Sequence, residues 1–202
     1  MLKNILLAIS LYGCFIVNAA AQNCVLCAQP DDNNFKEYYA AKALKTVEDL
    51  NYKIAIIGDK KTQIIDSDKA IKNACHLFIN KGEKDVFVEV LSLDHVKLYT
   101  RSVKDFFRRL RMLQWDRVEI TASEFAYVDK LRLETDGNCY GTISYKYCFR
   151  YTKGSKTQSD CSTKMVAVTV APEYDPCNKD QTRTCYTVQL GSITTLKDRI
   201  VQ

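Results

Sequence analysis

One carboxylate in the chain stands where its surroundings would favour acid–base chemistry. Residues 117–133 alternate like a β-strand, which places Glu124 on the same face as five apolar side chains. A carboxylate held among such neighbours has its pKa raised towards the range that is useful for proton transfer. A β-bulge near Ser123 would reverse the phase and turn Glu124 to solvent, and we favour this second arrangement because long curled strands often require bulges.

Aromatic side chains alternate along the next predicted strand. They occupy one face at Tyr145, Tyr147, Phe149 and Tyr151. Such a row is typical of ordinary sheet packing, but it also suits the wall of a ligand pocket. We take Glu124, Tyr145 and Tyr147 as the candidate pocket residues and assign no residue a catalytic role.

Two of the nine cysteines are predicted to face each other across a hairpin. Gly154-Ser155 is a two-residue turn signal, and such a turn pairs positions whose numbers sum to 309. Cys148 and Cys161 are one such pair, and cross-strand neighbours are within disulfide reach. A second local disulfide, Cys177–Cys185, would close a seven-residue polar loop.

Four further cysteines, Cys24, Cys27, Cys75 and Cys139, complete the expected disulfide framework, and the sequence allows three connectivities among them. The Cys-x-x-Cys spacing near the N-terminus also occurs in other sites. A redox pair needs the first sulfur at a helix N-terminus, haem attachment needs His in place of Ala28, and a zinc site needs a second ligand pair. Structural disulfides are the preferred interpretation, and we expect neither a metal nor a cofactor.

The other chemistry-bearing residues form no recognisable set. His76 and His95 are the only histidines, and neither has neighbours typical of a metal site or a nucleophile. No phosphate loop or nucleophile elbow occurs. Basic residues on the third predicted helix would suit an acidic partner or a membrane surface, although a solvated helix face is the simpler interpretation; they are Lys104, Arg108, Arg109 and Arg111.

The N-terminal segment indicates export. A short basic start and an apolar run from Ile5 to Val17 precede Ala19-Ala20-Ala21, the pattern of a signal peptide that is cleaved before Gln22. The run is shorter than the roughly 20 residues of a membrane-spanning helix, so we expect no transmembrane segment in the mature form. Acylation at Cys14 is the less favoured alternative. A periplasmic or secreted location would let the cysteines oxidise.

Length and charge indicate the number of domains and the kind of partner. Removing the signal peptide, residues 1–21, from the 202 residues leaves 181, which we divide into a disulfide-pinned lead-in segment (22–33) and a single domain (34–202). Removing Lys3 with it leaves 28 basic and 24 acidic residues, a net charge of +4. Nucleic-acid binders usually concentrate far more positive charge, so we expect no nucleic-acid partner.

The order of elements is that of an α+β protein. Apolar periodicity predicts helices over 34–57, 66–82 and 102–113, with a strand over 86–93 and a short extended piece over 96–99 before the last helix. Long strand runs follow at 117–133, 140–151, 164–171 and 185–195. Because such long strands twist and curl, we expect three helices packed on a strongly curved, cone-like antiparallel sheet with a cavity at its concave end.

Three stretches carry a resemblance to a known family: 88–93, 103–120 and 136–143. Together with the order of elements over 34–195, they resemble the nuclear transport factor 2-like superfamily, in the form found as exported single-domain proteins of Gram-negative bacteria. The resemblance implies a cone with a pocket between the curled sheet and the helices. The superfamily includes enzymes, transport adaptors and non-catalytic scaffolds, and its catalytic members line the pocket with Asp, His or Tyr; no such set aligns with this chain.

Three functional hypotheses follow. The leading one is an exported non-catalytic domain that binds a small apolar ligand or a protein partner. The second is a small hydrolyase or isomerase that uses Glu124 together with a pocket tyrosine. The third is a component of a surface or secretion assembly, which a stable homodimer or a large exposed apolar patch would support.

Overall fold

The computed structural model describes residues 33–83, 85–91, 97–113, 115–173 and 185–196. The helices are α1 (Asn33–Gly58), α2 (Ile64–Cys75), the 3-10 segment Ile79–Gly82 and α3 (Val103–Leu113). The strands are β1 (Phe87–Leu91), β2 (Leu98–Ser102), β3 (Arg117–Leu133), β4 (Cys139–Lys153), β5 (Lys156–Glu173) and β6 (Cys185–Leu196).

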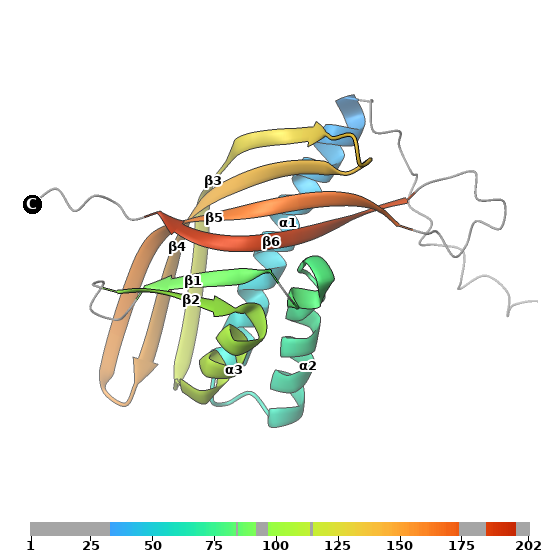
Figure 1. Ribbon diagram of the computed structural model, residues 1–202. Coiled ribbons are helices and arrows are strands. Elements are labelled where there is room, and N and C mark those ends of the chain that lie inside the picture. Colours follow the sequence, from blue (N-terminus) through green and yellow to red (C-terminus); the bar gives the residue numbers. More distant parts are fainter. Residues whose placement is uncertain (1–32, 84, 92–96, 114, 174–184, 197–202) are drawn as a thin grey trace, which may run out of the picture.

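The strands form one sheet in the order β2-β1-β6-β5-β4-β3. All described neighbours are antiparallel except β1 and β6, which are parallel. The long strands β3, β4 and β5 bend, so that the sheet curls around α1, while α2 and α3 lie beside one end of that helix (Figure 1). This confirms the predicted class of three helices on a strongly curved sheet, and it is the arrangement that the nuclear transport factor 2-like resemblance implies.

The helix α1 forms because its apolar residues recur every three or four positions and face the sheet. Those residues are at most 5% exposed: Phe35, Tyr39, Ala43, Val47, Leu50, Ile54 and Ile57. Gly58 ends the helix against β3, where an added Cβ would lie 3.2 Å from Val118 and 3.3 Å from the Trp115 ring. Ser102 begins α3 by accepting a hydrogen bond from the Asp105 backbone N–H at 3.1 Å, as its position predicts.

Two predicted boundaries are wrong. The second helix ends at Cys75 instead of continuing to Gly82. Phe78 already has an extended backbone (φ −100°, ψ 153°), and Asn80 and Lys81 after it have positive φ angles of 51° and 56°, which an α-helix does not contain. The strand β5 starts at Lys156, eight residues earlier than expected. The tight turn at Gly154-Ser155 lets β4 and β5 pair along the whole hairpin.

That register brings Cys148 directly opposite Cys161, and the predicted disulfide between them is confirmed. Cys185 is also disulfide-bonded, but Cys24, Cys27 and Cys177 lie outside the described residues, so the pairings that involve them stay predictions.

The expected role of Cys75 in the disulfide framework is wrong. Cys75 is a buried free thiol on the last turn of α2, and burial raises its pKa, so it behaves as a small core residue. Cys139 is fully buried at the start of β4. Its predicted place in the framework stays a prediction.

The core has two halves along α1. In the packed half, side chains fill the space between helix and sheet; its members include Phe35, Val47, Ile143, Val166, Val168, Val170 and Leu190, each at most 1% exposed. In the hollow half, beginning at Leu50 on α1, Tyr145 on β4 and Ile193 on β6, the corresponding residues line a cavity. The functional analysis concerns the hollow half.

Candidate functional site

The cavity occupies the hollow half of the core and has a volume of about 610 Å³. Its walls come from the C-terminal half of α1, from α3, and from β1, β2, β4, β5 and β6. Sites for small molecules and cofactors usually measure 300 to 1,000 Å³ and are lined mainly by apolar and aromatic side chains. The cavity therefore has the size of a small-molecule site.

The wall formed by β4 is aromatic. Tyr145, Tyr147, Phe149 and Tyr151 line the cavity from alternate positions, with successive ring centroids 5.7 to 6.4 Å apart. Two predicted pocket residues, Tyr145 and Tyr147, are therefore part of the lining. Burial raises the pKa of both hydroxyls, so each stays protonated at neutral pH and is able to donate a hydrogen bond.

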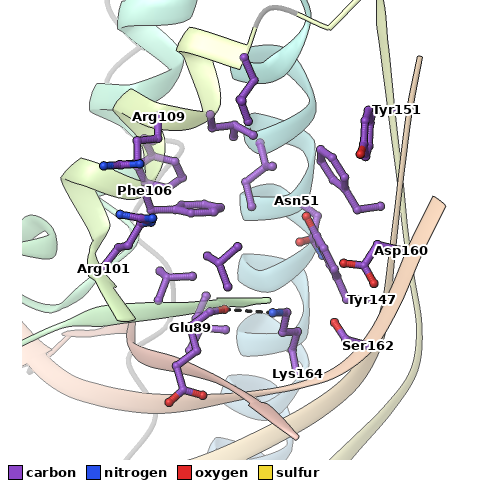
Figure 2. A pocket seen from close by; sticks show the side chains of 18 of the residues that line it. Asn51, Glu89, Arg101, Phe106, Arg109, Tyr147, Tyr151, Asp160, Ser162 and Lys164 are labelled. Atoms are coloured by element: carbon purple, nitrogen blue, oxygen red, sulfur yellow. Dashed lines mark hydrogen bonds between the residues drawn. The ribbon is translucent and has the colours of Figure 1, made fainter. Parts of the chain in front are cut away.

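An amino group enters the cavity from β5. Lys164 Nζ donates hydrogen bonds to the backbone oxygen of Glu89 at 3.0 Å and to Thr195 Oγ1 at 2.6 Å (Figure 2). Burial lowers the pKa of Lys164 to about 8, although the nearby charges of Asp160 and Glu89 oppose this shift. The amine is therefore still mostly protonated at neutral pH but lies close to its titration range.

A buried amide also faces the cavity. Asn51 on α1 is only 6% exposed, and neither its Oδ1 nor its Nδ2 has a hydrogen-bond partner. Leaving a buried polar group unsatisfied costs about 1 to 3 kcal/mol. Because Asn51 lines the cavity, a polar group on a bound molecule would remove this cost.

The polar groups lie on two sides of the cavity. Figure 2 shows Asn51, Tyr147, Asp160, Ser162 and Lys164 towards β4 and β5. On the other side, Arg101 of β2 and Arg109 of α3 lie near Phe106 (Figure 2). The lining also contains apolar side chains, among them Leu50, Ile54 and Phe107.

Glu124 does not belong to this site, so its assignment to the pocket is wrong. Its backbone has a positive φ of 55°, and the register of β3 against β4 shifts between Ser123 and Ala126. This is the bulge that the sequence analysis favoured, and it turns the side chain outwards. The Glu124 side chain is 69% exposed and lies 3.3 Å from Lys146 Nζ. The hydrolyase or isomerase hypothesis required Glu124 beside a pocket tyrosine, so we abandon that form of it.

The structure describes one of the two histidines. His76 is exposed and lies 2.8 Å, through Nδ1, from the Lys72 carbonyl oxygen, and His95 lies outside the described residues. In the part of the chain that the structure describes, no group of three His, Cys, Asp or Glu side chains is placed to hold a metal ion. Among the same residues, no helix has the length and apolar character that a membrane span requires.

Sequence reasoning missed Asn51, Lys164, Ser162 and Arg101, and it favoured a solvated helix face for Arg109, which lines the cavity. Asn51 directly follows Leu50 in the buried stripe of α1, where an apolar residue is expected. Ser162 and Lys164 share a face of β5 with buried Val166 and Val168. Polar residues at inward-facing positions were thus the available signal.

No family model matches the chain, and no curated protein matches its sequence. Solved structures do. A protein described as a scytalone dehydratase from Novosphingobium aromaticivorans is 9% identical, with 81% of this chain and 89% of that one covered and a TM-score of 0.44. A periplasmic fragment of TraM is 10% identical, with coverage of 75% and 96% and a TM-score of 0.43. ActVI-ORFA from Streptomyces coelicolor is 11% identical, with coverage of 81% and 99% and a TM-score of 0.43. At these identities and scores, the functions of those proteins carry no weight for this chain.

Proposed function

We propose that this protein binds a small, largely apolar molecule in the cavity of its hollow half. The observation that carries the proposal is the combination of a cavity of about 610 Å³ with a buried amide, Asn51, that has no hydrogen-bond partner. A cavity kept only by imperfect packing would be expected to have apolar walls, since unpaired buried amides are costly. A bound molecule accounts for both features.

The aromatic wall supports the same proposal. Flat apolar ligands gain dispersion and ring contacts against Tyr147 and Phe149, whose rings are nearly parallel to each other at 15°. Asn51, together with the Tyr145 and Tyr147 hydroxyls, would orient one polar group of the ligand. The chemistry required of these residues is binding and orientation.

The sole tryptophan makes the proposal testable, because Trp115 lines the cavity. The uncharged probe N-phenyl-1-naphthylamine absorbs where tryptophan emits. We expect it to bind in a saturable, one-to-one manner and to show energy transfer from Trp115. Val90→Phe, which places a ring in the cavity from β1, should abolish this binding.

Thr100→Phe is the matched control, since it adds the same ring to β2 at an exposed position outside the cavity. It should leave probe binding unchanged. Absence of energy transfer in the wild type, or equal binding by the Val90→Phe variant, would contradict the proposal. The hypothesis of a protein partner would then take its place.

We further propose that the chain is an exported member of the nuclear transport factor 2-like superfamily. The signal-peptide pattern before Gln22 and the Cys148–Cys161 disulfide support export, since stable disulfides form in oxidising compartments. Expression in a Gram-negative host, followed by periplasmic extraction and intact mass measurement, should give a chain that starts at Gln22 with this disulfide formed. An uncut chain with a reduced Cys148 would contradict export.

A further inference from the structure

We infer that the ligand is an amphipathic organic anion, whose acidic group is held by Arg101 and Arg109 and whose apolar body lies in the cavity. The inference rests on the proposed function, because it assigns the chemical class of the molecule bound there. It comes from comparing these two arginines with the other basic residues around α3.

The basic residues on α3 that point away from the cavity have acidic partners. Lys104 pairs with Glu83 at 2.6 Å, Arg108 with Asp105 at 3.7 Å, and Arg111 with Asp68. Among the described residues, neither Arg101 nor Arg109 takes part in an ion pair with a carboxylate. The two basic residues of this region that line the cavity are thus the two whose guanidinium groups have no such partner.

The two guanidinium groups line the same cavity. Arg101 comes from β2 and Arg109 from the following helix, and both line the cavity on the side of Phe106 (Figure 2). The Arg101 guanidinium lies 5.3 Å from the centre of the Tyr99 ring, a cation–π contact that limits its freedom. Arginine presents a planar fork of N–H donors that matches carboxylate, sulfonate and phosphate groups.

The charge of the whole lining agrees with an anionic ligand. Five basic side chains line the cavity, against two acidic ones, Glu89 and Asp160. Glu89 already accepts a hydrogen bond from the Thr195 backbone N–H at 2.8 Å through its carboxylate. Asp160 lies near Lys164, on the side of the cavity away from the arginines (Figure 2). Of the two acidic lining residues, Asp160 is therefore distant from the arginines and Glu89 already has a hydrogen-bond donor.

This arrangement defines the shape of the ligand. An acidic group at the arginines is followed by an apolar body across Leu50 and Ile54, and a hydrogen-bonding group at the far end meets Asn51. An aliphatic acid and an aromatic acid share this chemistry.

Two fluorescent probes test the contribution of the acidic group to binding separately from that of the apolar body. 8-Anilinonaphthalene-1-sulfonate is N-phenyl-1-naphthylamine with one added sulfonate. The wild type should bind the sulfonate about tenfold more tightly than the uncharged probe, as expected for a charge-assisted contact. Equal or weaker binding of the sulfonate would overturn the anionic assignment and leave the proposed function standing, whereas failure of both probes would overturn both.

Variants then locate the contact. The double substitution Arg101→Met and Arg109→Met should remove the preference for the sulfonate, measured as the ratio of the affinities for the charged and the uncharged probe. Arg108→Met and Arg111→Met together form the matched control, because they remove the same charge from the same region without touching the lining. If the control pair reduces the preference as much as the cavity pair, the assignment to Arg101 and Arg109 is wrong.

Competition identifies the body of the acid. Decanoate and naphthalene-2-carboxylate should each be tested for displacement of the bound sulfonate probe at one-to-one stoichiometry. Displacement by decanoate alone assigns an aliphatic acid, displacement by the naphthoate alone assigns an aromatic one, and displacement by both assigns a site for either; all three support the inference. Displacement by neither would overturn it.

Discussion

The two halves of the core use the same helix and the same sheet but treat polar groups differently. In the packed half, Val47, Ile143 and Leu190 are fully buried apolar residues. One turn further along α1, Leu50 and Asn51 face a cavity. The change from apolar to mixed lining coincides with the change from packed to hollow.

The two halves contribute differently to the stability of the fold. Side chains packed without voids contribute dispersion and burial of apolar area, so the packed half supplies most of the stability. The hollow half gives up such contacts and retains the buried amide of Asn51 and the partly buried amine of Lys164, which are costly there. Such costs are typical of binding sites, which natural proteins maintain at the expense of stability.

The largest expected effect lies in the packed half. Leu190→Ala removes a fully buried side chain and should lower the free energy of unfolding by about 3 kcal/mol. Binding of N-phenyl-1-naphthylamine should be unchanged, because Leu190 is outside the cavity lining. Urea denaturation measures the first and fluorescence titration the second. Leu196→Ala, on the same strand but 42% exposed, is the control. An equal loss of unfolding free energy in both variants would contradict the assignment of most of the stability to the packed half.

The opposite sign is expected in the hollow half. Asn51→Leu replaces an unsatisfied buried amide by an apolar side chain of similar size, and should raise the free energy of unfolding of the ligand-free protein by about 1 to 2 kcal/mol. A drop in stability, measured by the same urea denaturation, would show that the amide is satisfied without a ligand.

The titration of Lys164 gives a pH test. Its pKa of about 8 lies below that of a lysine in the unfolded chain. Between these two values the unfolded state binds more protons, so the free energy of unfolding rises with pH. Above pH 8, the free energy of unfolding of the wild type should therefore rise by about 1 kcal/mol per pH unit relative to that of Lys164→Met. Lys146→Met, the same change at a half-exposed surface site, is the control. A flat difference for Lys164→Met would contradict the burial of its charge.

The smallest effect is expected outside both halves. Glu124→Gly should raise the free energy of unfolding by about 0.5 kcal/mol, because glycine tolerates the positive φ at this bulge and the exposed ion pair with Lys146 contributes little. Ligand affinity, followed with either naphthyl probe, should not change. A loss of affinity would restore a role for Glu124 in binding.

The sequence predicted the elements well because their signals are local. The apolar stripe of α1, the cap at Ser102 and the turn at Gly154-Ser155 each depend on residues within a few positions of one another. The turn even fixed the register that joins Cys148 to Cys161. The end of α2 was misjudged because the backbone becomes extended at Phe78 and left-handed at Asn80 and Lys81 without a glycine or proline at any of these positions.

The site was predicted only in part because it depends on long-range geometry. Tyr145 and Tyr147 were found from alternation along one strand. Glu124 was grouped with them on the same alternation, although the bulge that was favoured near Ser123, and that the structure contains, turns it to solvent. No local pattern distinguishes Val47 from Leu50, although one packs against the sheet and the other faces a cavity. That distinction arises from the curvature of the sheet, which depends on all its strands.

A crystal structure of the protein grown with N-phenyl-1-naphthylamine tests the central claim most directly. The account predicts one probe molecule inside the hollow half, with its rings against Tyr147 and Phe149 and a hydrogen bond between its N–H and Asn51 Oδ1. A cavity that stays empty while the probe binds elsewhere, or side chains that close the hollow half completely, would contradict it.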